Sequence, residues 1–254
     1  MTLETERPVQ NPCSIQEAKE ILGKKNVFGP EEWLKYLNIN LTKEQLAVGH
    51  KFNVTDTPEI PWSQSQLEHP EINQEHFLFL GINHYVERTI YGGESTDLKL
   101  GWWYNHFPAG TNPRSRYPRF ENISNVRIYD PIHIRVHEWW LCNHFATNTC
   151  GIRWYLMPVS FVTESDNLPY EQQVAMLPIE YEVPNAIERI VGNVLYCMNN
   201  KKYLDKDFYA RVSDKSDDGM RVAVNGDSAK GIKVNSFADS AYLKMGIASS
   251  RKLP

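Results

Sequence analysis

The chain has 254 residues, of which 41% are hydrophobic and 12% aromatic, so it can bury the core of one large domain or two modest ones. Its 27 basic and 31 acidic residues give a formal net charge of −4 at pH 7. Without a basic excess the surface does not attract phosphate backbones, which disfavours a dedicated nucleic-acid-binding protein. The first residues are polar and no run of roughly 18 apolar residues occurs, so we expect a soluble, cytoplasmic protein that does not enter membranes.

Common enzyme signatures are missing from the sequence. Neither a Gly-rich phosphate loop nor a GxSxG elbow occurs, and the four cysteines form no CxxC pair. A chain of this size needs no disulfides, so we expect reduced thiols at Cys13, Cys142, Cys150 and Cys197. These features favour a protein that is not an enzyme.

The first 54 residues predict a small helical subdomain. Three helices are indicated, and they begin after Ser14, at Pro30 and after Thr42. The first and third carry capping boxes, and proline suits the first position of the second. Three prolines within residues 55–75 then predict a linker or surface strap.

Residues 76–254 predict an α+β domain. The nearly continuous apolar run at 76–82 is typical of a strand buried on both faces, and a second core strand is expected at 152–157. Residues 91–121 are rich in Gly, Pro, Asn and Arg and predict an irregular insertion.

The C-terminal third predicts helices packed on a small sheet. A short helix is expected to begin at 168–169, and apolar side chains at helical spacing predict a long helix at 184–199. Four short β-prone runs follow, separated by turn residues, at 209–213, 221–225, 231–235 and 245–249. We therefore expect a mixed or antiparallel sheet covered by the long helix, with a four-stranded antiparallel meander at the C-terminus.

The first candidate site is a histidine cluster, His133, His137 and His144, with Glu138 beside it. On a strand, His133 and His137 are about 13 Å apart and cannot share one ion. On a helix opened by Pro131 they are about 6 Å apart and could bind one zinc ion, with Glu138 as general base. The alternating β-branched residues between them favour the strand, so ordinary hydrogen-bonded histidines are the favoured interpretation and a metal site is the alternative.

The second candidate site resembles a calcium loop. Asp214, Ser216 and Asp218 stand at positions one, three and five, and Gly219 stands at position six. Asn225 occupies the twelfth position, where a calcium loop needs a bidentate glutamate. A hairpin turn uses the same residue types, so a turn is favoured and calcium is the alternative. We expect no cofactor, with a divalent metal at one of these two sites as the remaining possibility.

Aromatic and basic residues supply candidate binding surfaces. Trp102 and Trp103 could stack on saccharides or unpaired bases, although core packing is the favoured interpretation for such pairs because adjacent strand residues face opposite ways. Arg114, Arg116 and Arg119 form a local basic patch that could contact phosphate or a partner's carboxylates.

Several segments, most of them between Trp139 and the C-terminus, are distinctive when taken together. They are His76-Phe77-Leu78-Phe79-Leu80-Gly81, Trp139-Trp140, Trp154-Tyr155-Leu156-Met157, Tyr181-Glu182-Val183-Pro184, Gly231-Ile232 and Gly246-Ile247-Ala248-Ser249-Ser250-Arg251-Lys252. The stretch from Trp139 to the end, which makes up a little under half of the chain, resembles together with the 76–81 segment a widespread family of uncharacterised bacterial proteins with no assigned activity. The resemblance implies a bacterial or mobile-element source and carries over no catalytic residue.

Taken together, these features predict a non-catalytic protein that binds another macromolecule, and we expect that partner to be a protein. One alternative is a metal-assisted hydrolase built on His133, His137 and His144. The other is a saccharide or nucleic-acid binder that uses an exposed tryptophan.

Overall fold

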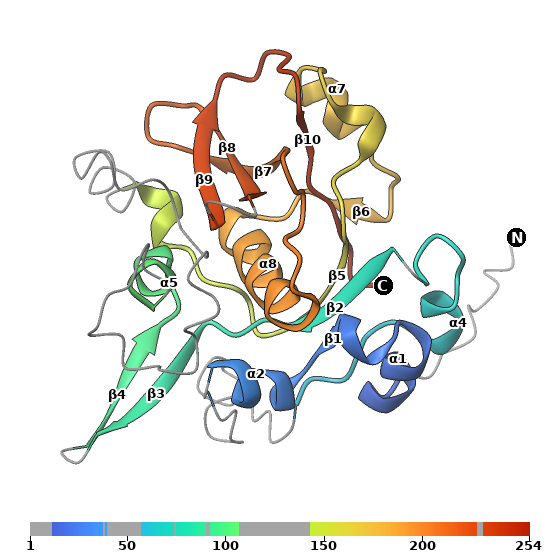
Figure 1. Ribbon diagram of the computed structural model, residues 1–254, viewed down its shortest axis with the longest axis vertical. Helices are drawn as coiled ribbons and strands as arrows, with labels where there is room; N and C mark the ends of the chain where they lie inside the picture. The colour runs from blue at the N-terminus through green and yellow to red at the C-terminus, as the bar shows by residue number, and fades with distance from the viewer. Residues whose placement is uncertain are drawn as a thin grey trace, which may run out of the picture.

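The computed structural model describes residues 12–37, 39, 57–73, 75–89, 92–106, 143–227 and 231–254. Within these ranges the chain forms a five-stranded sheet, a four-stranded sheet and a two-stranded hairpin, with helices between and around them (Figure 1). This is the α+β class that the sequence predicts. No helix in the described ranges is both long enough and apolar enough to cross a bilayer.

The five-stranded sheet has the order β1-β2-β5-β11-β6. Its strands are β1 (Val27–Phe28), β2 (His76–Leu80), β5 (Trp154–Pro158), β11 (Ser250–Arg251) and β6 (Tyr181–Glu182). Strand β2 is buried along its whole length, as its apolar run predicts. The sheet joins both ends of the described chain, because β1 pairs in parallel with β2 while β11 is antiparallel to β5 and β6.

The four-stranded sheet has the order β10-β7-β8-β9. Strands β7 (Tyr209–Lys215), β8 (Arg221–Asp227) and β9 (Gly231–Phe237) form the antiparallel part that the sequence predicts. Strand β10 (Met245–Ile247) pairs in parallel with β7, so the prediction of a fully antiparallel meander is wrong for the last strand.

The parallel direction of β10 is explained by the path of the chain across the sheet after β9. The buried guanidinium of Arg211 on β7 donates hydrogen bonds to the carbonyls of Ala238 and Ser240, and a further one to Leu168 at 3.1 Å. These bonds hold the segment after β9 across β7, so the chain reaches the far side of β7 before it forms β10. A side chain distant in sequence, rather than a local turn, therefore decides the strand direction.

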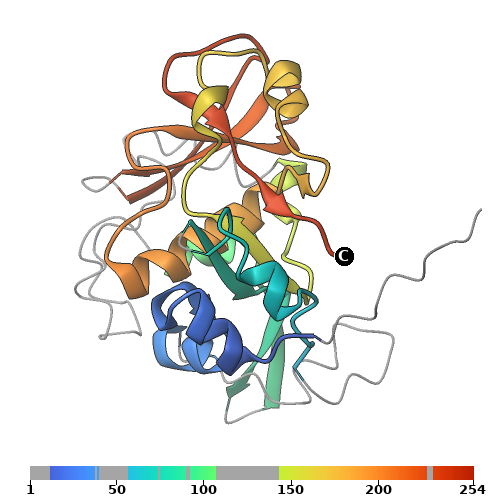
Figure 2. The same cartoon turned by 90° about the vertical axis from the view of Figure 1, so that its right-hand side faces the viewer.

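Helix α8 (Ala186–Asn200) lies between the two sheets (Figure 2). Asn185 and Glu188 form its N-terminal capping box, and Lys201 ends it in a left-handed conformation with φ 57°. A Cβ on Gly192 would lie 3.0 Å from the Phe77 ring, so this glycine allows α8 to lie close against β2. The long helix predicted at 184–199 is thereby confirmed.

The remaining helices are short. Helices α1 (Ile15–Ile21) and α2 (Pro30–Leu37) confirm the first two predicted helices, and α7 (Tyr170–Ala175) confirms the one expected after residues 168–169. The third N-terminal helix, predicted after Thr42, lies outside the described residues. Helix α4 (Gln64–Leu67) and the 3-10 turns η1 (Lys24–Asn26), η4 (His144–Thr147) and η5 (Thr163–Ser165) complete the set.

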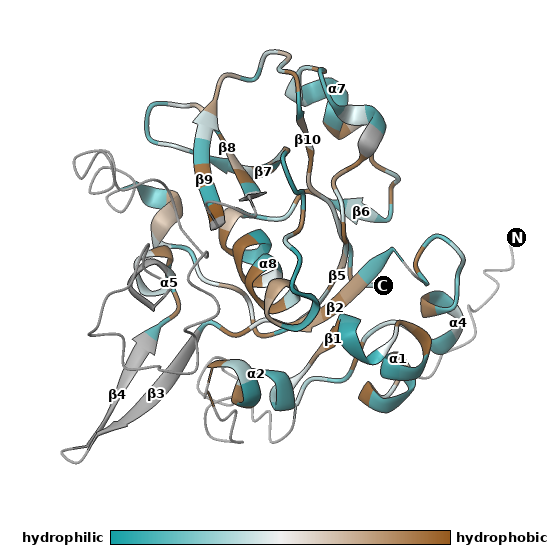
Figure 3. Cartoon of the chain, viewed as in Figure 1, coloured by the Kyte–Doolittle hydropathy of each residue, from teal (hydrophilic) through white to brown (hydrophobic). Residues whose placement is uncertain are grey.

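The strap predicted at 55–75 is anchored by Trp62 where the structure describes it. This side chain is buried, and its Nε1 atom donates to the carbonyl of Lys252 at 3.3 Å. Apolar residues concentrate on β2, β5 and the inner side of α8, whereas much of the visible surface of α1 and α2 is hydrophilic (Figure 3). Strand β5 buries Trp154 and Tyr155 alike, because both faces of this central strand are covered.

Regular elements occupy part of the predicted irregular insertion at 91–121. Strands β3 (His84–Thr89) and β4 (Gly92–Asp97) form an antiparallel hairpin, and helix α5 (Leu100–His106) follows it. Leu100 and Trp103 are buried and attach this helix to the core. The prediction of irregular structure is therefore wrong for 92–106, and residues 107–121 lie outside the described part.

Candidate functional site

Most residues of the histidine cluster and of the arginine patch lie outside the described residues. These are His133, His137, Glu138, Arg114, Arg116 and Arg119. His144 lies in η4, where its side chain is 95% exposed and its Nδ1 atom is 2.9 Å from Asp217 Oδ1. This contact lowers the pKa of the Asp217 carboxyl. Among the described residues, no group of three or more His, Cys, Asp or Glu side chains is placed to hold a metal ion.

The predicted calcium-loop residues take part in turn and cap interactions. The Asp214 carboxylate accepts hydrogen bonds from the Ala186 backbone N–H, at the start of α8, and from Asn148 Nδ2. The Ser216 hydroxyl donates to the Asp218 carboxylate within the turn. Asp214 thus faces the helix, while Ser216 and Asp218 bond to each other, an arrangement that supports the hairpin turn.

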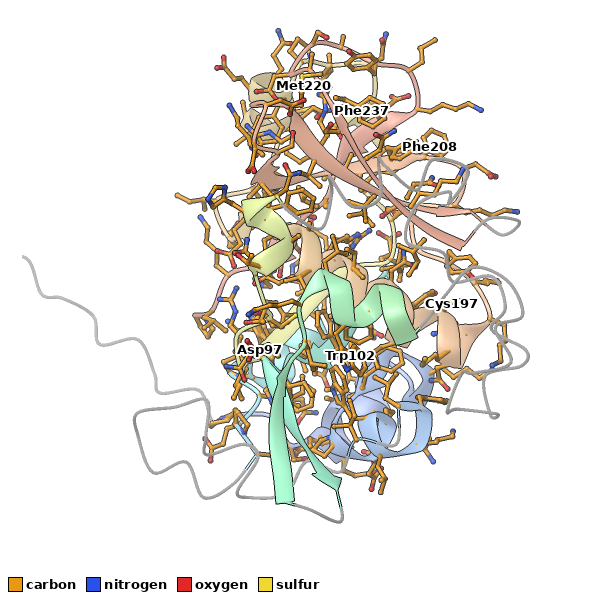
Figure 4. The ribbon with its side chains drawn as sticks, turned by 90° about the vertical axis from the view of Figure 1, so that its left-hand side faces the viewer. Asp97, Trp102, Cys197, Phe208, Met220 and Phe237 are labelled. Atoms are coloured by element: carbon orange, nitrogen blue, oxygen red, sulfur yellow. The ribbon has the colours of Figure 1, made fainter. Side chains whose placement is uncertain are left out.

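The two tryptophans are placed differently by α5. Trp103 is fully buried, and its ring centroid lies 6.2 Å from that of Trp33, so the binding role predicted for it is wrong. Trp102, which is labelled in Figure 4, is half-buried. Its ring meets that of Trp103 edge-on, with centroids 4.9 Å apart. Core packing accounts for Trp103 because its position on α5 faces the N-terminal helices.

A cleft of about 690 Å³, a size common for binding sites, opens among the described residues. It is lined by residues from the start of β2, the end of β5, the segment after α7 and β6. Its lining comprises Glu71, Glu75, His76, Pro158, Val159, Ser160, Phe161, Val162, Glu164, Met176, Leu177, Pro178, Tyr181, Tyr196 and Ser249. The cleft therefore collects residues from five separate parts of the chain.

The floor of the cleft holds a buried histidine paired with a tyrosine. His76 Nε2 and the Tyr181 hydroxyl are 3.0 Å apart, and His76 is only 4% exposed. Burial, together with the nearby positive charge of Arg251, lowers the pKa of His76 to about 4, so the imidazole is neutral at pH 7. Burial raises the pKa of Tyr181, against the lowering influence of Arg251, so the phenol keeps its proton.

The mouth of the cleft is apolar on the side of α7. Ile179 is 83% exposed and Met176 is 37% exposed, and Val174 on α7 is also exposed. Leu177 and Pro178 continue this surface into the cleft. A cluster of exposed apolar side chains next to a hollow marks a binding surface more often than isolated exposed residues do.

Acidic residues also line the cleft. Glu71 and Glu75 lie just before β2, Glu164 lies in η5, and all three are exposed. The positive side chains of Arg251 and Lys252 lie beside β6, where the Lys252 ammonium donates to the carbonyl of Ile179 at 2.7 Å. A ligand that enters the cleft therefore meets both apolar groups and carboxylates.

A second depression lies between α1 and α4 and is smaller, at about 320 Å³. Its lining is almost entirely polar or acidic: Glu17, Glu20, Ile21, Gln64, Glu68 and Asn73. It offers almost no apolar wall, so the larger cleft is the better candidate site.

Sequence reasoning did not identify this cleft. His76 was included in a predicted core strand, and His76, Tyr181 and Ser249 all belong to segments that carry the family resemblance, but none was assigned to a site. A histidine at the start of an otherwise apolar strand was the one local signal available. Comparisons of the chain with protein-family models, curated proteins and solved structures find no match, so the site stands on its geometry alone.

Proposed function

We propose that the protein is a non-catalytic binding protein that receives a polypeptide segment of another protein in the cleft between β2, β5, α7 and β6. The observation that carries this proposal is the exposed apolar surface of Met176, which lines the hollow, and of Ile179, which directly follows the lining residue Pro178. Removing such side chains from water is worth about 1.5–3 kcal/mol for each one that is fully buried. A partner that covers them therefore gains affinity at this place.

The charges at the mouth favour a partner segment that combines apolar and basic residues. Glu71, Glu75 and Glu164 attract lysine and arginine side chains by complementary charge. The same carboxylates repel phosphate groups, which makes a nucleic acid or an anionic lipid surface a poor occupant. The net charge of −4 acts in the same direction.

Selection from a displayed library of random peptides tests this proposal. The wild-type protein is expected to enrich sequences in which apolar residues are flanked by Lys or Arg. Ile179→Asp should weaken the binding of the enriched peptides about tenfold or more, because it puts a charge on the apolar side of the mouth. Leu34→Asp is the matched control, since Leu34 is an exposed apolar residue on α2, which does not line the cleft, and it should leave binding unchanged.

Two results would count against the proposal. One is that no peptide family is enriched above the background of the library. The other is that the enriched peptides bind wild-type protein and Ile179→Asp equally well. Thermal melts of both variants control for folding, because substitutions at exposed positions usually change stability by less than about 0.5 kcal/mol.

A further inference from the structure

The floor of the cleft has hydrogen-bonding capacity that the fold itself leaves unused. Ser249 is 2% exposed and lines the cleft, yet its hydroxyl makes no hydrogen bond with any residue that the structure describes. His76 is also more than nine-tenths buried, but its ring already faces the Tyr181 hydroxyl and backbone groups of Ile72 and Glu71, so Ser249 is the group left for a ligand. Leaving such a group unpaired costs roughly 1–3 kcal/mol, so a ligand that pairs with it gains affinity.

The hydrogen bonds around Tyr181 set the polarity of this floor. The Tyr181 hydroxyl lies 3.0 Å from His76 Nε2, and the Arg251 guanidinium lies 5.6 Å from the centroid of the Tyr181 ring. The tautomer of the imidazole decides which of His76 and Tyr181 donates this hydrogen bond. The floor is uncharged at pH 7 and can both donate and accept hydrogen bonds.

The walls above this floor contain aromatic rings. Phe161 and Tyr196 line the cleft, with Val159 and Leu177 beside them. Phe161 is held in place from behind by Phe208, with ring centroids 5.1 Å apart. Aromatic walls favour a planar ring, which can stack or meet them edge-on.

We propose that the cleft receives a tyrosine side chain of the partner segment, with its ring against the aromatic lining of Phe161 and Tyr196 and its hydroxyl at Ser249. This inference rests on the proposed function, because it names the residue that the bound segment inserts. Tyrosine matches the site because it combines a flat apolar ring with a tip that donates and accepts one hydrogen bond each. Phenylalanine would leave the Ser249 hydroxyl unpaired, and phosphotyrosine would bring negative charge to a mouth lined by Glu71 and Glu164.

Fluorescence anisotropy with four labelled peptides tests the inference. The peptides share one short lysine-flanked apolar frame and differ only at the central residue, which is Tyr, Phe, Leu or phosphotyrosine. The Tyr peptide is expected to bind wild-type protein about tenfold more tightly than the Phe peptide, and the phosphotyrosine peptide is expected to bind more weakly than both. Ser249→Ala should make the Tyr and Phe peptides bind alike. Ser160→Ala is the matched control, because Ser160 lines the cleft at an exposed position and should leave the preference intact.

The possible outcomes separate this inference from the proposed function. Equal binding of the Tyr and Phe peptides, or preferred binding of the phosphotyrosine peptide, overturns the tyrosine inference while a peptide-binding cleft stands. Failure of all four peptides overturns the tyrosine inference, and the proposed function falls only if the library selection also enriches nothing. If Ser249→Ala does not fold, the affinities of wild-type protein for the Tyr and Phe peptides still decide whether the cleft prefers tyrosine.

Discussion

Replacing Arg189 with methionine should destabilise the protein by about 3–5 kcal/mol, because it leaves the Asp205 carboxylate buried without its counter-charge. Both side chains are fully buried, and the Arg189 Nε and Nη2 atoms lie 3.0 and 2.6 Å from Asp205 Oδ2. Arg189 Nη1 also donates to the Pro158 carbonyl at 3.1 Å, which ties α8 to the wall of the cleft. The loss is large compared with the roughly 5–15 kcal/mol that stabilises a typical domain.

The size of this loss should depend on pH. Burial raises the pKa of the Asp205 carboxyl, and Arg189 opposes that rise, so the pKa climbs further in Arg189→Met. A carboxyl whose pKa is higher in the folded than in the unfolded state takes up a proton on folding, so it favours the folded state at low pH and this contribution is lost as pH rises. The defect of Arg189→Met should therefore be smaller at pH 5 than at pH 8.

Urea denaturation at pH 5 and pH 8 measures the free energy of unfolding of wild-type protein and Arg189→Met. The melting temperature of Arg189→Met should also fall by roughly 6–20 °C, at about 2–4 °C for each kcal/mol lost. Adding Asp205→Leu to Arg189→Met should recover much of the stability, since no charge then stays buried. Lys99→Met is the control: its ion pair with Asp97, at 2.7 Å, lies at the surface with both side chains about half exposed, and losing it should cost less than about 1 kcal/mol. A loss below about 1 kcal/mol in Arg189→Met, or one that does not change with pH, would refute the reasoning.

Three further predictions concern the cleft and the core. Gly246→Ala should lower the free energy of unfolding by about 1–3 kcal/mol and weaken peptide binding, because the added Cβ would lie 1.9 Å from the Phe161 ring. Calorimetry measures the loss of stability and fluorescence anisotropy measures the binding. Wild-type stability together with wild-type binding would contradict this packing. NMR titration should give His76 a pKa of about 4 in the folded protein. The free energy of unfolding should then rise by up to about 3 kcal/mol between pH 4 and pH 6.5, because the unfolded state loses its histidine proton over this range. His76→Gln should reduce this dependence of stability on pH. The buried thiols of Cys13, Cys150 and Cys197 should resist thiol reagents until the protein unfolds, because burial raises their pKa values. Mass spectrometry after labelling of the folded protein checks this, and a labelled thiol among the three would contradict it.

Elements with local signals could be predicted from the sequence. The capping box at Ser14, the proline at the start of α2 and the apolar stripe of α8 each lie within a few residues of the structure that they form. The buried strand β2 was recognised for the same reason, because an unbroken apolar run suits a strand covered on both faces. Hydrogen bonds within a helix and the period of a strand are set over short distances, so a sequence pattern is enough to reveal them.

Strand order and the candidate site depended on tertiary packing. The parallel direction of β10 follows from the hydrogen bonds of Arg211 to residues after β9, and no turn signal in that stretch indicates it. His76 and Tyr181 are separated by 105 positions in the chain, and they meet only because β2, β6 and β11 belong to one sheet. The sequence by itself determined which segments are helices and strands, because those preferences are local. Only the tertiary structure decided which polar groups share the cleft, because their proximity arises from contacts between distant segments.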